Sequence, residues 1–411
     1  IPAKRFKVKV TEYMIGFGPA VWSTQRGETR YGIKAVPLGG YIRMIGMLPP
    51  GPDGRLRATS TGRFAQLVDD ARRQSAAEIG PGDEERAFYR LPVRKRVAVM
   101  LGGPTMNLLL AFVLFGIVLV GIGLPRPTAS VASVQACTPT ASQPRATPLP
   151  SGRCPDRSPP SPAAVAGIRP GDRIVAIGGT DVRTWSDATT WIRANPGVST
   201  EMTVERDGSA VVVPVTIASA LRPVLDEAGN PTDEVVTAGY LGVGPSFAWE
   251  QQPLTAVPAY MWDLTSRSVV ALVSLPVRLY ELVVDTLVGG QDRSIDSPVS
   301  VVGASRLGGD IAAMDEPLRA KAATFLGLIA SLNLFLFLFN LIPILPLDGG
   351  HVAGALYEGA RRSIARVRGR PDPGPVDLAR LLPVAYVATG ALLLMGLVVI
   401  WADLVKPLSL D

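Results

Sequence analysis

Three long apolar runs without a charged residue dominate the pattern of the chain, at residues 97–125, 322–347 and 381–402. Each exceeds the roughly 20 residues that a helix needs to cross the hydrocarbon core of a bilayer. Buried helices of soluble proteins seldom stay uncharged over such a length, so the pattern predicts three transmembrane helices. A fourth apolar stretch, residues 268–277, is too short to cross and is bounded by charged residues. It is predicted to belong to an amphipathic helix lying on the membrane surface.

Composition agrees with a membrane protein. Of the 411 residues, 47% are hydrophobic and only 18% are charged, whereas soluble domains carry about 25% charged residues. This balance excludes a disordered chain. Two cysteines exclude a cysteine-based zinc cluster, and the single histidine excludes a site built from several histidines of this chain alone. The net charge of +6 is better explained by membrane orientation than by nucleic-acid binding, because the basic residues flank the apolar runs without interleaved aromatics.

The charges also predict an orientation. Residues 1–96 carry a net charge of +9 and residues 349–380 a net charge of +3, whereas residues 126–321 carry −4. Since basic loops remain in the cytoplasm, the first and third segments are predicted to be cytoplasmic and the middle segment to lie outside the plasma (inner) membrane.

The outer segment contains a recognisable module that begins at residues 161–180. It includes the run Ala166-Gly167-Ile168-Arg-Pro-Gly-Asp, in which tight turns lead into a strand. The elements predicted after it are a helix at 185–194 and strands at 201–205 and 211–217. This order resembles a bacterial PDZ domain, a fold that binds peptides by adding a strand to a sheet edge. The resemblance implies that Ala166, Gly167 and Ile168 belong to the peptide-binding region, and the alternative is an unrelated small α+β domain.

Both cysteines lie in this outer segment. Cys137 and Cys154 flank a Pro/Ser-rich insert at residues 138–153. An oxidising compartment permits a disulfide between them, with two free thiols as the alternative. A bridge would close the insert and contribute about 3 kcal/mol through chain entropy.

The second apolar run ends in an unusual sequence, Asn340-Leu-Ile-Pro343-Ile-Leu-Pro346-Leu-Asp348-Gly349-Gly350-His351. Its prolines and glycines are predicted to break the helix at membrane depth. A carboxylate at that depth is costly, so Asp348 is a functional candidate, and aspartate oxygen is a ligand that zinc accepts. The alternative is an aspartate that snorkels from the helix end to the membrane surface.

Two further motifs precede this one. The first apolar run carries Gly103, Pro104 and Asn107, where small residues allow close helix approach and an amide needs a polar partner in lipid. Residues 13–44 form two apolar, aromatic runs separated by the polar segment 23–30, which predicts a β-hairpin dipping into the membrane interface. The hairpin contains Gly16-Phe17-Gly18-Pro and Pro-Leu-Gly39-Gly40-Tyr41.

Together these motifs resemble the site-2 protease family of intramembrane zinc metalloproteases, in its bacterial PDZ-containing branch. The resemblance implies that Asp348 is a Zn²⁺ ligand and that Asn340 contacts the substrate backbone or the oxyanion. It implies a site-shaping role for Gly103, Pro104, Asn107, Pro343 and Gly349. The hairpin residues that would clamp an unwound substrate by strand pairing are Gly16, Phe17, Gly18, Gly39, Gly40 and Tyr41.

One family motif is missing from the sequence. Family members hold zinc with the two histidines of a His-Glu-x-x-His helix, whose glutamate activates water, and no such run occurs here. In the family that helix comes just before a basic stretch such as Lys4-Arg5. The sequence is therefore expected to begin after the metal-binding helix, with both histidine ligands upstream of Ile1. As given it would be inactive, and a metal-free relative is the alternative.

The fold class expected is a polytopic α-helical membrane protein with a membrane-associated β-hairpin and an extracytoplasmic α+β PDZ domain. The expected function is proteolysis within the membrane of a single-pass protein already cut outside it, with an anti-sigma factor as the favoured substrate. The alternative is a non-catalytic PDZ-bearing scaffold, and a transporter is disfavoured because no inverted repeat occurs. The expected segments are a cytoplasmic part with the hairpin (1–96), a span (97–125), the PDZ domain (126–250), an outer amphipathic region (251–321), a span with the aspartate motif (322–350), a cytoplasmic loop (351–380), a span (381–402) and an outer tail (403–411).

Overall fold

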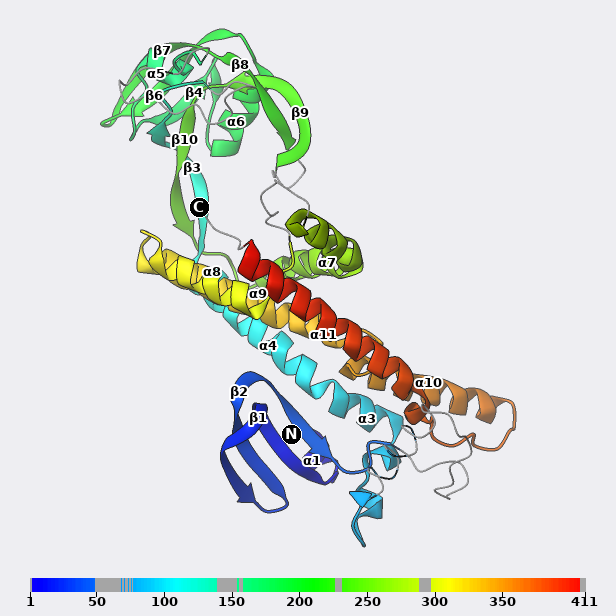
Figure 1. The fold of residues 1–411 in the computed structure, drawn as a ribbon. Helices are drawn as coiled ribbons and strands as arrows, with labels where there is room; N and C mark the ends of the chain where they lie inside the picture. The colour runs from blue at the N-terminus through cyan, green and yellow to red at the C-terminus, as the bar shows by residue number, and fades with distance from the viewer. Residues whose placement is uncertain are drawn as a thin grey trace. The chain divides into compact units, whose positions relative to one another are not determined.

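The computed structural model describes residues 2–48, 68, 70, 73, 75, 77–138, 154, 158–225, 231–287 and 297–406. The chain divides into two compact units, coloured along the chain in Figure 1. The helical unit comprises Ile1–Gly121 and Pro253–Asp411, and the β unit comprises Ile122–Gln252. Residues 139–153 of the expected insert and most of residues 53–76 lie outside the described residues.

Three helices of the helical unit are long and apolar enough to cross a membrane. They are α4 (Gly102–Gly116), which continues as a π-helix to Ile122, α9 (Leu318–Asn340) and α11 (Leu382–Val405). These helices coincide with the three apolar runs. Helices α4 and α9 pack against each other.

The second run ends in the helix break that its prolines and glycines predict. Helix α9 ends at Asn340, and Asp348 begins a separate helix, α10 (Asp348–Val367). The turns between them contain Pro343 and Pro346, which lack the backbone N–H that a continuous helix requires. Asp348 therefore lies beyond the apolar helix and not inside it.

The helical unit also contains a long helix that packs against all three. Helix α7 (Ala256–Leu287) contains the short apolar stretch assigned to an amphipathic helix, and it packs against α4, α9 and α11. The other helical elements of the unit are α1 (Pro2–Arg5), η1 (Glu84–Arg86), η2 (Phe88–Arg90), α3 (Val93–Met100), α8 (Val301–Ala313) and η4 (Leu378–Leu381).

The predicted hairpin consists of β1 (Val10–Arg26) and β2 (Thr29–Met44), which pair with several register shifts. Residues 12–15 pair on both sides, with residues 40–43 on one side and with residues 30–33 on the other. The two long strands thus double back into a small sheet. Gly16 makes this possible because it adopts φ +88°, and an added Cβ would lie 2.5 Å from the carbonyl oxygen of Val36.

A shared core joins this sheet to the helices. Val10 and Met44 of the sheet, Phe88 of η2 and Met100 of α3 are buried together. Val352 of α10 packs against the same cluster. The sheet and the start of α10 are thereby held by one set of apolar contacts.

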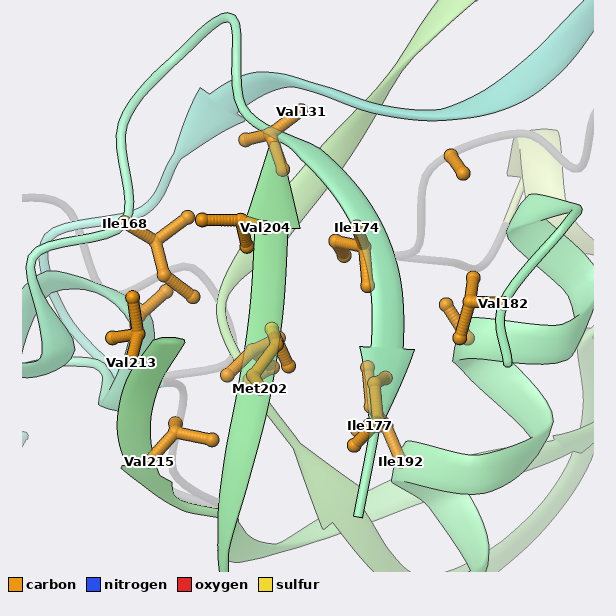
Figure 2. Close-up of a cluster of buried hydrophobic side chains, with 14 of the residues drawn as sticks. Val131, Ile168, Ile174, Ile177, Val182, Ile192, Met202, Val204, Val213 and Val215 are labelled. Carbon is orange, nitrogen blue, oxygen red and sulfur yellow. The ribbon is translucent and has the colours of Figure 1, made fainter. Parts of the chain in front are cut away.

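The β unit is built on a six-stranded sheet in the order β10-β3-β4-β6-β7, with β5 pairing to β4. Its buried core includes Ile174, Ile177, Met202 and Val204, which lie side by side on the neighbouring strands β4 and β6 in Figure 2. The helix expected at 185–194 is α6. The elements of the unit are β3 (Leu124–Val134), α5 (Pro162–Ala166), β4 (Arg173–Ile177), β5 (Thr180–Asp181), α6 (Trp185–Ala194), β6 (Ser199–Arg206), β7 (Ser209–Thr216), β8 (Ala218–Leu225), β9 (Pro231–Tyr240) and β10 (Val243–Glu250).

A buried ion pair stabilises the turn before β4. Asp172 is 1% exposed and receives two hydrogen bonds from Arg206, Nε to Oδ1 at 2.8 Å and Nη2 to Oδ2 at 2.7 Å. The backbone N–H of Arg169 donates a further bond to its carboxylate. These donors, above all Arg206, hold the pKa of Asp172 below its ordinary value.

Candidate functional site

Asp348 is the first residue of α10, and the two glycines after it allow that helix to pack tightly. Gly349 and Gly350 are buried. A Cβ at Gly349 would lie 2.4 Å from the carbonyl oxygen of Ile342, and one at Gly350 would lie 2.6 Å from the backbone nitrogen of Leu345. Both neighbours are backbone atoms that cannot rotate away. The glycines therefore let the chain fold back on itself, which sets where the Asp348 carboxylate lies.

The motif of the first apolar helix lies beside this carboxylate. A Cβ at Gly103 of α4 would lie 3.7 Å from Asp348 Oδ2. Pro104 is buried, and Asn107 lies one turn further along α4 and is half-buried. Two motifs more than 240 residues apart in the sequence, Gly103 and Asp348, thus meet at one point.

Two other residues expected at the site, Asn340 and Pro343, lie between the end of α9 and the start of α10. Asn340 ends α9, and its Nδ2 donates to the carbonyl oxygen of Leu336 at 2.9 Å, so its amide group binds its own helix in this state. Pro343 lies in the exposed turn between α9 and α10. Neither residue is shown in contact with Asp348.

A buried charged cluster on α10 was not anticipated from the sequence. Glu358 is 1% exposed and pairs with Arg96 of α3, whose side chain is 8% exposed. Glu358 also accepts a hydrogen bond from the backbone N–H of Val376 at 3.0 Å and pairs with Arg362 at 3.2 Å. These contacts tie α10 to α3 and to the loop before η4. Arg96 and Glu358 each lie among other charged residues in the sequence. No local pattern distinguishes them from exposed charges.

His351 lies one turn after Asp348 and faces the same cluster. Its Nδ1 is buried and has no hydrogen-bond partner within the described part of the chain. With Arg96 it lines a small cavity of about 10 Å³. The face of α10 that carries His351, Ala355 and Glu358 is therefore the face turned toward the protein.

The sheet contributes aromatic and charged side chains. Tyr41 donates a hydrogen bond to Glu12 at 2.9 Å and stacks on Phe17 with ring centroids 6.1 Å apart. Gly18 adopts φ +86°, and an added Cβ at Gly40 would lie 2.8 Å from the Met14 carbonyl oxygen. Gly39 directly precedes Gly40 in β2.

A metal site is incomplete in the described ranges. No group of three or more His, Cys, Asp or Glu side chains there could hold a metal ion. The Asp348 carboxylate is chemically suited to zinc, but a zinc site in a protein takes three or four ligands. The described residues therefore do not fit a complete zinc centre and supply one candidate ligand.

The residues expected to bind peptide in the β unit lie in its core or at the end of a helix. Ile168 is 4% exposed within the core, Ala166 packs against that core, and Gly167 ends α5 with φ +73°. Peptide binding beside them stays a prediction. Cys137 and Cys154 form a disulfide.

Comparison with known proteins agrees with these motifs. The chain matches Peptidase family M50 over residues 1–371. It is 36% identical to zinc metalloprotease Rip1 of Mycobacterium bovis, over 99% of this chain and 93% of the relative. It is 35% identical to zinc metalloprotease Rip1 of Mycolicibacterium smegmatis, with the same coverage, and 26% identical to zinc metalloprotease RasP of Oceanobacillus iheyensis, over 98% of this chain and 93% of the relative. The chain therefore belongs to peptidase family M50, the site-2 protease family of zinc metalloproteases that its motifs resemble.

Proposed function

We propose that this protein cleaves a peptide bond within the transmembrane segment of a single-pass membrane protein that has already been cut outside the membrane. An anti-sigma factor is the substrate class that the family resemblance favours. The observation that carries the proposal is the approach of Asp348, the first residue of α10, to Gly103 in the first turn of the apolar helix α4. A carboxylate held there by buried glycines is costly unless it serves a site.

Asp348 is proposed as one zinc ligand. The two remaining protein ligands are proposed to be the histidines of a His-Glu-x-x-His helix, as in the family that the sequence resembles. When bound, zinc would supply Lewis-acid activation of the peptide carbonyl and of water. Family membership supports zinc, and the assignment of its ligands is part of the proposal.

The sheet is proposed to hold the substrate in an extended form. Residues 40–43 pair with residues 12–15 on one side, and beside them lies an open groove of about 530 Å³. The groove is lined by Glu12, Tyr41, Ile42, Arg43, Met44, Met47, Leu48, Ser75 and Glu78. A peptide added along this edge would be drawn out of its helix, which exposes the carbonyl that a helix hides.

The location follows from the charges of the segments. The protein is proposed to be a multi-pass protein of the plasma (inner) membrane, with the β unit outside and the site of Asp348 toward the cytoplasm. The β unit is proposed to be a PDZ domain that admits only clients shortened by the first cut.

A second candidate is a PDZ-bearing scaffold that holds membrane clients without cutting them. The described residues supply one candidate zinc ligand, which is compatible with either candidate. The two candidates differ in what replacement of Asp348 does.

The test uses the protein expressed from its own gene, with a tagged single-pass client. The proposal predicts that Asp348→Asn abolishes client cleavage and lowers bound zinc, measured by immunoblot and elemental analysis. Asp372→Asn is the matched control, because this aspartate is 65% exposed and lies in a loop. Uncut client with the natural sequence, or undiminished cutting by Asp348→Asn, would refute the protease and leave the scaffold.

A further inference from the structure

Helix α10 has a second face that the candidate site does not use. Leu356, Tyr357, Ile364 and Val367 are 57%, 62%, 53% and 88% exposed. At 3.6 residues per turn these four side chains fall within an arc of about 100°, the width of the apolar stripe of an amphipathic helix. They lie opposite Glu358, which faces the protein. The helix therefore presents an apolar stripe that no described element covers.

Basic residues flank the same stripe near the end of the helix. The segment 361–370 contains five arginines and no acidic residue. Arg361 is occupied by the carbonyl oxygens of Pro373 and Gly374, at 2.8 and 2.7 Å. Arg362 is occupied by Glu358 and Asp372.

The last three arginines differ from these two. Arg366, Arg368 and Arg370 are exposed, and none of them forms an ion pair with a carboxylate of the described chain. Guanidinium groups bind phosphate strongly because they present parallel N–H donors. Arg368 and Arg370 follow Val367, the last residue of α10, and Arg366 lies in its last turn, outside the arc of the stripe. Exposed guanidinium groups at the end of an apolar stripe match the chemistry of an anionic phospholipid surface.

We infer that the outward face of α10 binds the surface of a bilayer that contains anionic phospholipid. Arg366, Arg368 and Arg370 contact headgroup phosphates, and the stripe that includes Ile364 and Val367 enters the boundary of the acyl chains. A lipid surface is favoured over nucleic acid or an acidic protein because α10 lies in the chain between two helices able to cross a membrane, α9 and α11.

This contact bears on the site but does not depend on catalysis. The helix is 20 residues long, which spans about 30 Å, and Asp348 is its first residue. A membrane surface that holds the far end of α10 would fix the orientation of the helix that carries the carboxylate. Because lipid binding is measured on its own, its failure would leave the proposed protease activity standing.

The test places a nitroxide label at Val367→Cys in the full chain. The two native cysteines are joined in a disulfide, so the label finds a single thiol. The protein is reconstituted in nanodiscs of phosphatidylcholine alone or with about a third of phosphatidylglycerol. Electron paramagnetic resonance then compares the collision of the label with oxygen, which enters lipid, and with a water-soluble nickel complex.

The expected result is a label accessible to oxygen and protected from nickel only when phosphatidylglycerol is present. Each arginine near such a surface contributes about a fivefold preference. Replacing Arg366, Arg368 and Arg370 by glutamine should therefore reduce the preference of the α10 face for anionic over neutral discs by about 100-fold.

The matched control removes the same charge elsewhere. Arg126, Arg173 and Arg267 are exposed and paired with Glu250, Glu205 and Asp263, and their triple glutamine variant should keep the protection. The inference is overturned if the label is equally accessible to nickel in both lipids, or if it is protected without phosphatidylglycerol. Protection produced only by added RNA or by an acidic peptide would also overturn it.

Discussion

Gly349→Ala offers a sharp test of how the structure positions Asp348. The added Cβ would lie 2.4 Å from the Ile342 carbonyl oxygen and 2.5 Å from the Leu341 carbonyl carbon. Since contacts shorter than 3.4 Å are already tight for a Cβ atom, relief requires a shift of about 1 Å in the start of α10. A displacement of 1 Å in a reacting group costs about 100-fold in rate. We therefore expect client cleavage to fall by about that factor.

Two other glycines serve as comparisons for the expected effect of Gly349→Ala. A Cβ at Gly327, inside α9, meets no atom within 4 Å, so Gly327→Ala should leave cleavage unchanged and stabilise the helix by about 0.5–1 kcal/mol. A Cβ at Gly103 would make an ordinary contact with the Asp348 carboxylate at 3.7 Å. Gly103→Ala should therefore have an effect between those of the other two variants.

The assay follows the uncut and cut forms of a tagged single-pass client over time, in cells that express each variant at equal level. Bound zinc is measured on the purified proteins. The reasoning fails if Gly349→Ala cleaves the client as fast as the natural protein does. It also fails if Gly327→Ala is as defective as Gly349→Ala, because the loss would then not come from the backbone clash.

Three further outcomes are expected. Because the pKa of Asp172 is lowered, its contribution to the stability of the β unit is complete above about pH 4 and is lost as the pH falls through that lowered pKa. In Asp172→Asn the free energy of unfolding, followed by circular dichroism, should therefore depend less on pH in the acid range. An unchanged dependence on pH would contradict this. Replacing Cys137 and Cys154 by serine removes a bridge across a separation of 17 residues and should lower the free energy of unfolding of the β unit by about 3 kcal/mol, measured with denaturant. Arg96→Met leaves the buried Glu358 without its main partner and should cost about 3 kcal/mol, whereas adding Glu358→Leu should restore most of the loss; equal destabilisation of the single and double variants would show that the pair is not the cause.

Local patterns in the sequence were sufficient to predict the main helices and strands and to indicate the family. An apolar run longer than a bilayer crossing predicts a helix without knowledge of its neighbours, and the three runs are α4, α9 and α11. Turn residues likewise predicted the order of strands and the helix at 185–194 in the β unit. The motif around Asp348 indicated the family because prolines, glycines and a carboxylate seldom occur together beside an apolar helix.

Other features depend on contacts between distant segments. Residues 12–15 pair on both sides, although two apolar, aromatic runs separated by a polar segment predict only a simple hairpin. Arg96 and Glu358 are 262 residues apart, and nothing in either local sequence shows that they are buried together. The approach of Gly103 to Asp348 also depends on contacts between distant segments. So does the division of α10 into an inward and an outward face. Side-chain periodicity is set within a few residues, whereas burial and proximity are set by which helices pack together, so only the tertiary structure decides them.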